Sequence, residues 1–580
     1  MAKLTFKGIG ITDDARRNQK KRLSPLVFLS LTLYFLFVNF YFTKDLLAQQ
    51  ELKDFKYWAS LCDLLKNEKK YTEALAACDQ ALALNPNEAI VWTNRSEALL
   101  KLKKYPEALA SADTALRRKS NSSLALTARC RALLEVGNPE EAIASCDKAL
   151  EGDKKWGNSS PALVWYNRGL AQAKLGQYQE AIASYDRAVE LNPTYALASI
   201  ERCQALSSMN QNSEALTACD KALEKEGNWE DSTPAYGWDI RGRVLKKLGQ
   251  YQEAIASFNK GLAINPNNAT IWTHHGEVLQ LLGKYAEAMT SHEWALKTNP
   301  KYSLALANQA ATLNRLGNYE KALAACDSAI QGDGNWEDET AAIAWDRRGS
   351  ALAGLNKYEE ALASSDRAIA LKSDYAEAWN NRSVTLWFMG RHQEALASSD
   401  RAIEINPTYS QAWYNRGRIL QTLKQDIDAV VAYERAINSY GNLGDNRPLA
   451  DMWANRSVVL WRLQRYGEAL ASTNRAIDIN PTSFQAWYNR GIVLLALNEY
   501  DRAVSAYDQA IRINPNDANL FAAKGFALIR VKRLQEALAT FEQALKIDPN
   551  NASAQRNRDT VMQQLEQKND TMMQPLEQKN

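Results

Sequence analysis

Apolar residues recur three or four positions apart through most of the chain, and residues 484–517 show this pattern most clearly. The residues that define its two faces are Trp487, Gly491 and Leu494, then Ala503, Tyr507 and Ala510. Asn498 and Glu499 separate the two runs, and Pro515 ends the unit. The spacing predicts two short amphipathic helices joined by a tight turn. Such a hairpin is too small to bury its own apolar face, so it must stack on a neighbour.

The same unit of about 34 residues recurs fourteen times between residues 55 and 551. The copies start at Phe55, Ala89, Ser123, Ala162, Ala196, Ala235, Ala269, Ser303, Ala342, Ala376, Ser410, Ala450, Phe484 and Ala518. Insertions lengthen four copies near residues 152–160, 225–234, 331–341 and 438–449. The chain is therefore predicted to form one array, because repeats of this kind stack on each other rather than fold as separate domains. Residues 552–580 are polar and rich in Gln. They are expected to form a capping helix whose last ten or so residues fray. Residues 559–569 are nearly duplicated by residues 570–580, and Pro575 interrupts the second copy.

Certain residue types keep fixed places in the unit. Positions 4, 8, 20, 24, 27 and 32 carry Trp165, Gly169, Ala181, Tyr185, Ala188 and Pro193 in the fourth copy. The sixth copy repeats this with Trp238, Gly242, Ala254, Phe258 and Pro266. This pattern resembles the tetratricopeptide repeat. The resemblance implies an all-α fold, a right-handed superhelical solenoid of about fourteen helix hairpins with a concave groove lined by the first helix of each pair. The chain is also similar to long variants of this repeat found in many bacterial proteins.

A different pattern precedes the array. Residues 1–23 carry a net charge of +5, and residues 24–42 are 19 residues without a charge. That length is enough to cross a hydrocarbon core of about 30 Å. We predict a basic cytoplasmic tail at 1–23, a transmembrane helix at 24–42 and a juxtamembrane linker at 43–54. The positive flank then puts the array on the periplasmic or lumenal side of an inner or comparable membrane. The alternatives are a signal peptide cleaved after Ala48 and an array that stays in the cytoplasm.

Composition and motifs narrow the function. The net charge is only +3, which opposes a nucleic-acid partner. The chain has no P-loop, nucleophile elbow or zinc-protease motif. We therefore predict no catalytic residue, no cofactor and no small-molecule substrate. The expected function is a non-enzymatic, membrane-anchored scaffold that binds a protein or peptide segment in the groove. The alternatives are an accessory array of an enzyme complex, such as a glycosyltransferase, and an assembly factor for a membrane complex.

Two polar positions recur on the predicted hairpins. Position 7 is Arg in ten copies and position 25 is Asp in nine. These positions face each other when a hairpin turns near position 16. We therefore predict structural ion pairs within or between neighbouring repeats, since a partly buried Arg would be costly unpaired. Arg168 and Asp186, and Arg490 and Asp508, are the representative residues.

Position 6 is Asn in seven copies: Asn94, Asn167, Asn308, Asn381, Asn415, Asn455 and Asn489. An Asn amide both donates and accepts, so this ladder could bond an extended peptide backbone in the groove. The other interpretation is that these residues stabilise the array itself. No copy has Lys at position 5. The carboxylate clamp that chaperone-binding members of this family use is therefore not expected.

Cysteines fall in pairs at positions 8 and 24: Cys62 and Cys78, Cys130 and Cys146, and Cys203 and Cys219. If oxidised, each pair would close a loop of about 17 residues and contribute roughly 3 kcal/mol. The other interpretation is that Cys is a small apolar residue at a packed position. Three histidines, His274, His275 and His292, share one repeat, but no fourth zinc ligand is evident by spacing, so no metal is predicted.

Tryptophan changes place in three of the lengthened copies. Trp156, Trp229 and Trp336 lie in insertions of copies that lack the aromatic residue at position 4. We expect each to fold back into that place. The alternative is an exposed anchor for a partner.

Overall fold

The computed structural model is helical throughout the residues that it describes, with no strand among them. These are residue 50 and residues 53–577, except 158, 225–226, 228, 230–231, 338 and 442–446. The predicted basic tail at 1–23, the transmembrane helix at 24–42 and most of the linker at 43–54 lie outside the described residues. Of the helices that are described, none combines the length and the hydropathy that crossing a bilayer requires.

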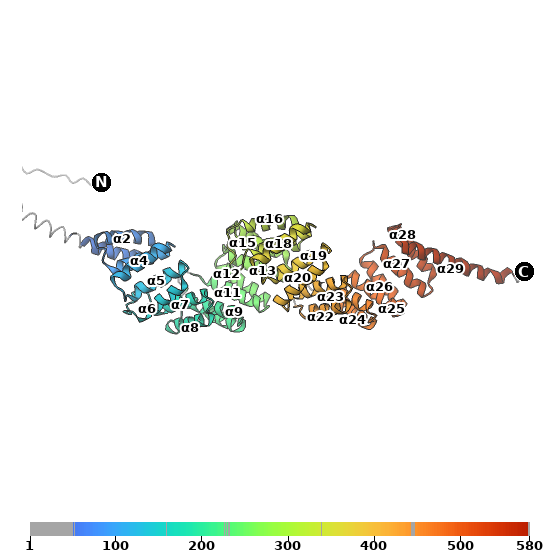
Figure 1. Ribbon diagram of the computed structural model, residues 1–580, viewed down its shortest axis with the longest axis horizontal. Coiled ribbons are helices and arrows are strands. Elements are labelled where there is room, and N and C mark those ends of the chain that lie inside the picture. The colour runs from blue at the N-terminus through green and yellow to red at the C-terminus, as the bar shows by residue number, and fades with distance from the viewer. Residues whose placement is uncertain are drawn as a thin grey trace, which may run out of the picture. The chain divides into compact units, whose positions relative to one another are not determined.

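The chain divides into two compact units, residues 1–211 with 225–228 and residues 212–224 with 229–580. In unit 1, residues 53–67 are helical. The helices that follow are α2 (Tyr71–Leu84), α3 (Ala89–Lys101), α4 (Tyr105–Arg118), α5 (Ser123–Glu135), α6 (Pro139–Glu151), α7 (Pro161–Lys174), α8 (Tyr178–Leu191) and α9 (Ala196–Ser208). Figure 1 shows how these helices follow one another as short hairpins.

Unit 2 continues the same pattern over a longer stretch. It holds α10 (Asn212–Leu223), α11 (Pro234–Lys247), α12 (Tyr251–Ile264), α13 (Ala269–Leu281), α14 (Tyr285–Thr298), α15 (Ser303–Arg315), α16 (Tyr319–Ile330), α17 (Ala342–Gly354), α18 (Tyr358–Leu371), α19 (Ala376–Phe388), α20 (His392–Ile405), α21 (Ser410–Thr422), α22 (Asp426–Asn438), α23 (Arg447–Arg462), α24 (Tyr466–Ile479), α25 (Phe484–Ala496), α26 (Tyr500–Ile513), α27 (Ala518–Arg530), α28 (Leu534–Ile547) and α29 (Ala552–Glu577).

The helix bounds follow the repeat frame. From the second repeat onward, each first helix begins within three residues of the predicted start. The all-α solenoid of tetratricopeptide type is therefore confirmed. Its right-handed superhelical course stays a prediction.

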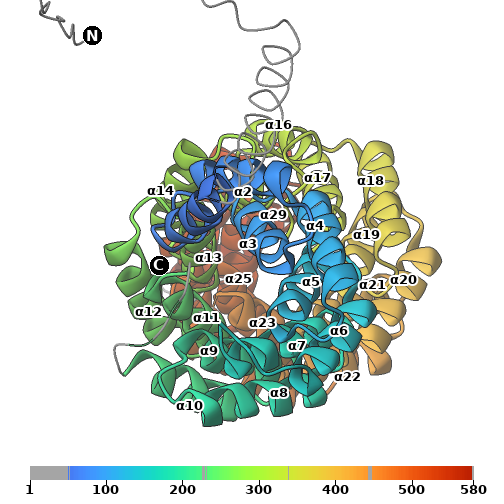
Figure 2. The same ribbon diagram turned by 90° about the vertical axis from the view of Figure 1, so that its left-hand side faces the viewer.

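Stacking gives the two helices of a repeat different neighbours. In unit 2 a first helix packs against its own second helix and against the second helix before it. From α11 to α25 it also packs against adjacent first helices. Figure 2 shows the second helices α12, α14, α18 and α20 on the outer side of unit 2, and the first helices α13, α23 and α25 nearer its inside. We call the side formed by the odd-numbered helices α11 to α27 the inner face of unit 2.

The hairpin interior explains two recurring sequence features. A Cβ atom on Gly491 would lie 2.5 Å from Cε1 of Tyr507, so this position requires glycine for the close approach of the two helices. Position 15, in the turn, has a positive φ in every repeat, for example 73° at Gly176 and 63° at Asn498. Glycine and asparagine adopt this left-handed conformation most readily.

The last repeat is capped by α29. This helix packs on α27 and α28, and its Ala554 and Val561 are fully buried. Capping was expected, and α29 continues to Glu577.

Candidate functional site

A repeating arginine contact joins successive repeats. In nine of the ten repeats with Arg at position 7, this arginine forms an ion pair with the position-25 acid of the preceding repeat's second helix. In seven of them another guanidinium nitrogen donates to the position-23 serine of its own second helix. Arg382, for example, lies 2.8 Å from Asp366 and donates to Ser398 over 2.7 Å. Its guanidinium also lies 5.8 Å from the ring centre of Trp379. One side chain thus bridges three helices, and this role accounts for the arginines without a ligand.

The representative pairs Arg168–Asp186 and Arg490–Asp508 do not form within one repeat, because each of these aspartates pairs with the following repeat. Arg168 pairs with Asp147 of the preceding repeat at 2.8 Å, and Asp186 pairs with Arg202 of the following one at 2.6 Å. Asp508 pairs with Lys524. The physical reason is that each first helix packs against two second helices, its own and the preceding one, and the carboxylate within reach is on the preceding one.

Arg490 departs from the pattern. The position facing it in the preceding repeat is Asn474, and its Nε atom is buried without a hydrogen-bond partner. Burial lowers the pKa of Arg490. The guanidinium lies 5.3 Å from the ring centre of Trp487. This arginine is therefore held by its ring contact and not by Asp508.

The asparagine ladder is mostly turned into the array. Five of its seven side chains are at most 5 % exposed: Asn94, Asn167, Asn308, Asn415 and Asn489. The others, Asn381 and Asn455, are half-buried.

Most of these amides bond an adjacent repeat. Asn94 donates to Asp63, Asn415 donates to Asn380, and Asn489 donates to the carbonyl oxygen of Ala454. Asn381 donates to Asp346 and Asn455 to the Tyr414 hydroxyl, while Asn308 accepts from Arg347. The Nδ2 atom of Asn167 is buried without a partner. Most amides of the candidate peptide-binding ladder thus bond neighbouring repeats. This supports the interpretation that these asparagines stabilise the array itself.

A buried charged cluster lies on the inner face of unit 2, and the sequence reasoning missed it. The imidazole of His274 on α13 lies between two carboxylates. Its Nδ1 atom is 2.8 Å from Asp239 on α11, and its Nε2 atom is 3.0 Å from Glu337 in the 331–341 insertion. The Tyr302 hydroxyl donates to Glu337. The insertion thus reaches back one repeat and closes over His274. A histidine at position 6, where half of the repeats have Asn, was the available signal.

The electrostatics fix the protonation state of this cluster. Burial alone would lower the pKa of His274, but the carboxylates of Asp239 and Glu337 outweigh it and raise the pKa to about 9. Burial would raise the pKa of Glu337, but the hydrogen bonds from His274 and Tyr302 lower it to about 2. The imidazolium donates through both ring nitrogens, so it has no lone pair for a metal ion or for base catalysis.

Other charged groups on this face also have partners within the protein. Lys246 and Glu277 lie 2.9 Å apart, and Arg347 donates to Asn308 over 2.7 Å. Asp346 accepts from Asn381, and burial raises its pKa to about 6. We call the inner face from α11 to α17 the charged segment.

The inner face changes character from α19 to α27, which we call the aromatic segment. Phe388 is 51 % exposed, Trp461 is 38 % exposed and Phe526 is 44 % exposed, and they lie on α19, α23 and α27. On the first helices of the charged segment, Leu281 is the one large apolar side chain with comparable exposure among the described residues. Large exposed apolar groups on a first-helix face are the feature of this array that suits a protein partner.

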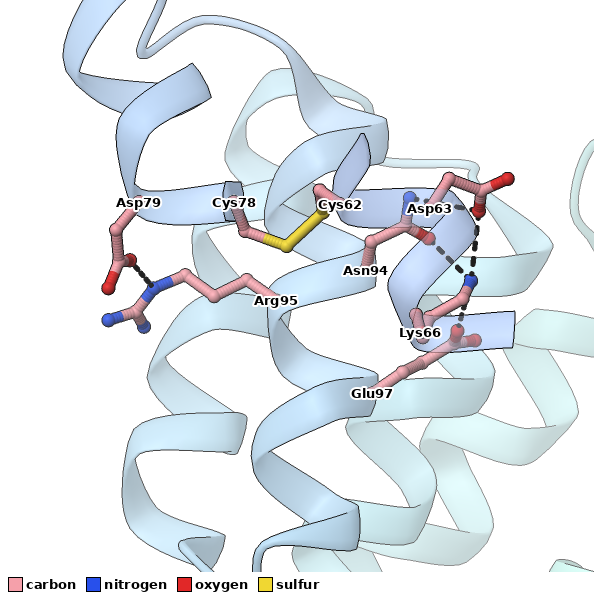
Figure 3. The surroundings of a disulfide bond; sticks show 8 residues. All are labelled: Cys62, Asp63, Lys66, Cys78, Asp79, Asn94, Arg95 and Glu97. Carbon is pink, nitrogen blue, oxygen red and sulfur yellow. Dashed lines mark hydrogen bonds and ion pairs between the residues drawn. A yellow bond between two sulfur atoms is a disulfide. The ribbon is translucent and has the colours of Figure 1, made fainter. Parts of the chain in front are cut away.

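Cysteines join two hairpins of unit 1. Cys62 and Cys78 form a disulfide with their Cα atoms 4.9 Å apart, and Cys130 and Cys146 form another at 5.4 Å. Figure 3 shows the first disulfide between the Arg95–Asp79 ion pair and the group that contains Asn94, Asp63 and Lys66. Cys203 and Cys219 are also disulfide-bonded, and Cys326 is a buried free thiol.

The insertion tryptophans pack inward. Trp156 contacts the cluster that includes Leu126, and Trp336 lies in a cluster with Leu306. Both leucines hold position 4, which is the place the tryptophans were expected to fill. Trp229 is 9 % exposed.

The other two histidines of the seventh repeat have separate partners. His275 lies 3.0 Å from the Ser291 hydroxyl, and His292 lies 2.8 Å from the Gln280 amide. Within the described part of the chain, no group of three or more His, Cys, Asp or Glu side chains could hold a metal ion.

Comparison with protein families gives matches along most of the array. Models described as tetratricopeptide repeat match residues 61–123, 162–195, 275–335, 347–410, 400–431, 484–517 and 518–551, and a TPR repeat model matches 242–283. A protein prenyltransferase alpha subunit repeat model matches residues 466–497.

Similar individual proteins are more distant. Protein STIP1 homolog of Dictyostelium discoideum is 28 % identical over 111 residues, which are 19 % of each chain. The chain thus spans about a fifth of that relative's length. The crystal structure of the APC/C hetero-tetramer Cut9-Hcn1 has a TM-score of 0.56 at 15 % identity, covering 87 % of this chain and 96 % of that one. YrrB, a TPR protein with an unusual peptide-binding site, is 22 % identical over 34 % of this chain and 97 % of its own, with a TM-score of 0.29.

The family matches, the repeat frame and the helix bounds agree in phase along both units. The likeness to the Cut9-Hcn1 structure shows a shared fold. At 15 % identity it shows nothing about function. The chain belongs to the tetratricopeptide repeat family.

Proposed function

We propose that this protein is a non-enzymatic interaction scaffold that binds another protein on the inner face of unit 2. The observation that carries the proposal is the exposure of Phe388, Trp461 and Phe526 on first helices. Removing an aromatic side chain from water is favourable, so a partner that covers these rings gains binding free energy. The family supports the proposal, since tetratricopeptide repeats form protein-binding surfaces.

Site-specific photo-crosslinking tests this function. A photoreactive amino acid replaces Phe388 on the inner face, and in a control it replaces Trp294. Trp294 is 42 % exposed on α14, a second helix on the outer side. We expect Phe388 to give a defined protein adduct in native membranes and Trp294 to give none. Equal adducts at both positions, or none at Phe388, would refute the inner face as the binding surface.

We further propose that residues 24–42 anchor the scaffold in a membrane, with the array on the periplasmic or lumenal side. The uncharged stretch and its basic flank support this arrangement. The disulfides Cys62–Cys78 and Cys130–Cys146 support the same side, because disulfides persist in oxidising compartments. A phosphatase that is active only outside the cytoplasm, fused after residue 60, tests the orientation. An active fusion is expected, and an inactive one that is made in full would overturn it.

A further inference from the structure

We infer that the aromatic segment binds an extended protein segment of about a dozen residues that carries both apolar side chains and carboxylates. This inference rests on the proposed scaffold function and names the chemistry of its partner. Three features of the inner face support it: the buried charged groups of the charged segment already have partners, two cations of the aromatic segment lack an acid, and the exposed rings are spread over five repeats.

The charged segment is not free to take a charged ligand. His274 is held by Asp239 and Glu337, Lys246 by Glu277, and Arg347 by Asn308. A ligand that displaced these contacts would leave buried charges without partners, which costs several kcal/mol for each ion. The 331–341 insertion also covers His274 through Glu337. The open part of the inner face therefore begins after α17.

Two arginines on the aromatic segment have rings beside them and no carboxylate. The guanidinium of Arg418 on α21 lies 4.4 Å from the ring centre of Trp387 and 5.9 Å from that of Tyr414. Arg530 on α27 lies 5.0 Å from the Tyr500 ring and donates to its hydroxyl over 2.7 Å. Neither forms an ion pair with a described residue, in contrast to Arg382 or Arg416 at position 7.

This combination selects a partner. An arginine on an aromatic ring keeps its fork of donors free at the edge, where it can receive a carboxylate. Phe388, Trp461 and Phe526 supply exposed apolar surface on the same segment. Two acids lie on the helices that carry Phe388 and Trp461, namely Glu377 on α19 and Asp451 on α23. Charges of both signs disfavour a phosphate backbone, so we infer a protein partner with interspersed carboxylates rather than single-stranded RNA.

The spacing sets the length of the partner. Phe388, Trp461 and Phe526 belong to the tenth, twelfth and fourteenth repeats. Packed helices lie about 8–10 Å apart, so five successive first helices span about 40 Å. An extended chain covers that distance with about twelve residues at about 3.3 Å each. A single helix of the same number of residues would reach less than half of it.

Fluorescence anisotropy with three matched peptides tests the inference on the full chain in detergent. The first 15-residue peptide carries Leu, Phe and Glu among Ser spacers. The second has Lys in place of every Glu, and the third has Ser in place of every Leu and Phe. We expect the first peptide to bind at least tenfold more tightly than the other two. A labelled oligouridylate of 15 nucleotides serves as the RNA probe.

Matched variants locate the site. Trp461→Ala is expected to weaken the first peptide about tenfold. Arg418→Gln and Arg530→Gln are each expected to weaken it about fivefold, and less at high salt. The controls are Trp294→Ala and Arg401→Gln, exposed residues of the second helices α14 and α20, and both should bind unchanged. Phe526→Ala provides a second aromatic variant, and circular dichroism shows whether each variant keeps its helices.

The outcomes separate this inference from the scaffold function. Equal binding of the acidic and basic peptides, binding unaffected by both Trp461→Ala and Phe526→Ala, or tighter binding of oligouridylate would each overturn the inference. If no peptide binds while Phe388 still crosslinks a protein, the scaffold function stands and the partner chemistry is wrong. If the crosslink also fails, both are wrong.

Discussion

Arg490 offers a test of how the repeats are held together, because a single substitution should repair its missing ion pair. The position-25 residue that faces it is Asn474, where nine repeats have Asp. Eight of these aspartates are in close contact with the arginine of the next repeat, for example 2.8 Å between Arg382 and Asp366, and Asp508 pairs with Lys524. Asn474→Asp places a carboxylate at the corresponding site. We therefore expect the contact between α24 and α25 to become more stable.

The structure sets the size of the effect. In the Arg382–Asp366 pair the arginine side chain is 21 % exposed and the aspartate 52 % exposed. Solvent screens a half-exposed carboxylate, which limits the ion pair itself to about 0.5–1 kcal/mol. The Nε atom of Arg490 is buried without a partner, so satisfying it adds to the gain. We expect about 1 kcal/mol in total, which is about fivefold in a local opening equilibrium.

Hydrogen exchange is the suitable assay, because a long repeat array need not unfold in one step and a single melting temperature is then ill defined. Amides of α24 and α25 in Asn474→Asp should exchange about fivefold more slowly than in the natural protein. The matched control is Asp366→Asn, which removes the partner of Arg382 and should speed exchange in α18 and α19 by a similar factor. High salt should reduce both effects. Unchanged exchange in Asn474→Asp, with faster exchange in Asp366→Asn, would refute the role given to position 25 at Arg490.

Three further predictions concern packing, pH and the disulfides. Gly491→Ala should destabilise its repeat by about 1–3 kcal/mol in hydrogen exchange, because the new Cβ meets Tyr507 at 2.5 Å, whereas Gly467→Ala meets no atom within 4 Å and should be neutral or stabilising; equal effects would contradict the packing argument. The pKa of His274 is raised to about 9, so its contribution to stability is complete below the unfolded pKa of about 6.5 and is lost as pH rises through 9. Protection of the 331–341 insertion should therefore fall above pH 9, but not in His274→Gln; a fall of equal size in this variant would show that another group titrates. Replacing Cys130 and Cys146 by Ser should cost about 3 kcal/mol in the third repeat, and non-reducing peptide mapping of the natural protein should recover both residues in one linked peptide pair; free thiols there would refute the bond.

The sequence by itself determined the repeat frame and the helical fold. Spacings of three and four fix which side of a helix is apolar, and this is a local property of the chain. The place of each turn followed as well, since position 15 is often Gly or Asn and has a positive φ throughout. The cysteine pairs at positions 8 and 24 could be foreseen in the same way, because two residues 16 apart face each other across a hairpin.

Only the tertiary structure decided which neighbour each side chain meets. A first helix touches its own second helix, the preceding second helix and the adjacent first helices, and periodicity does not rank them. The sequence therefore placed Arg168 on the correct face of its helix but predicted Asp186 as its partner, whereas the structure pairs it with Asp147. Asn489 could be placed at position 6, but the approach of α23 buries it against Ala454. Glu337 reaches His274 through an insertion without helical periodicity, so no spacing rule relates the two residues. Stacking brings distant parts of the chain together, and the choice among several adjacent surfaces is a property of the whole array.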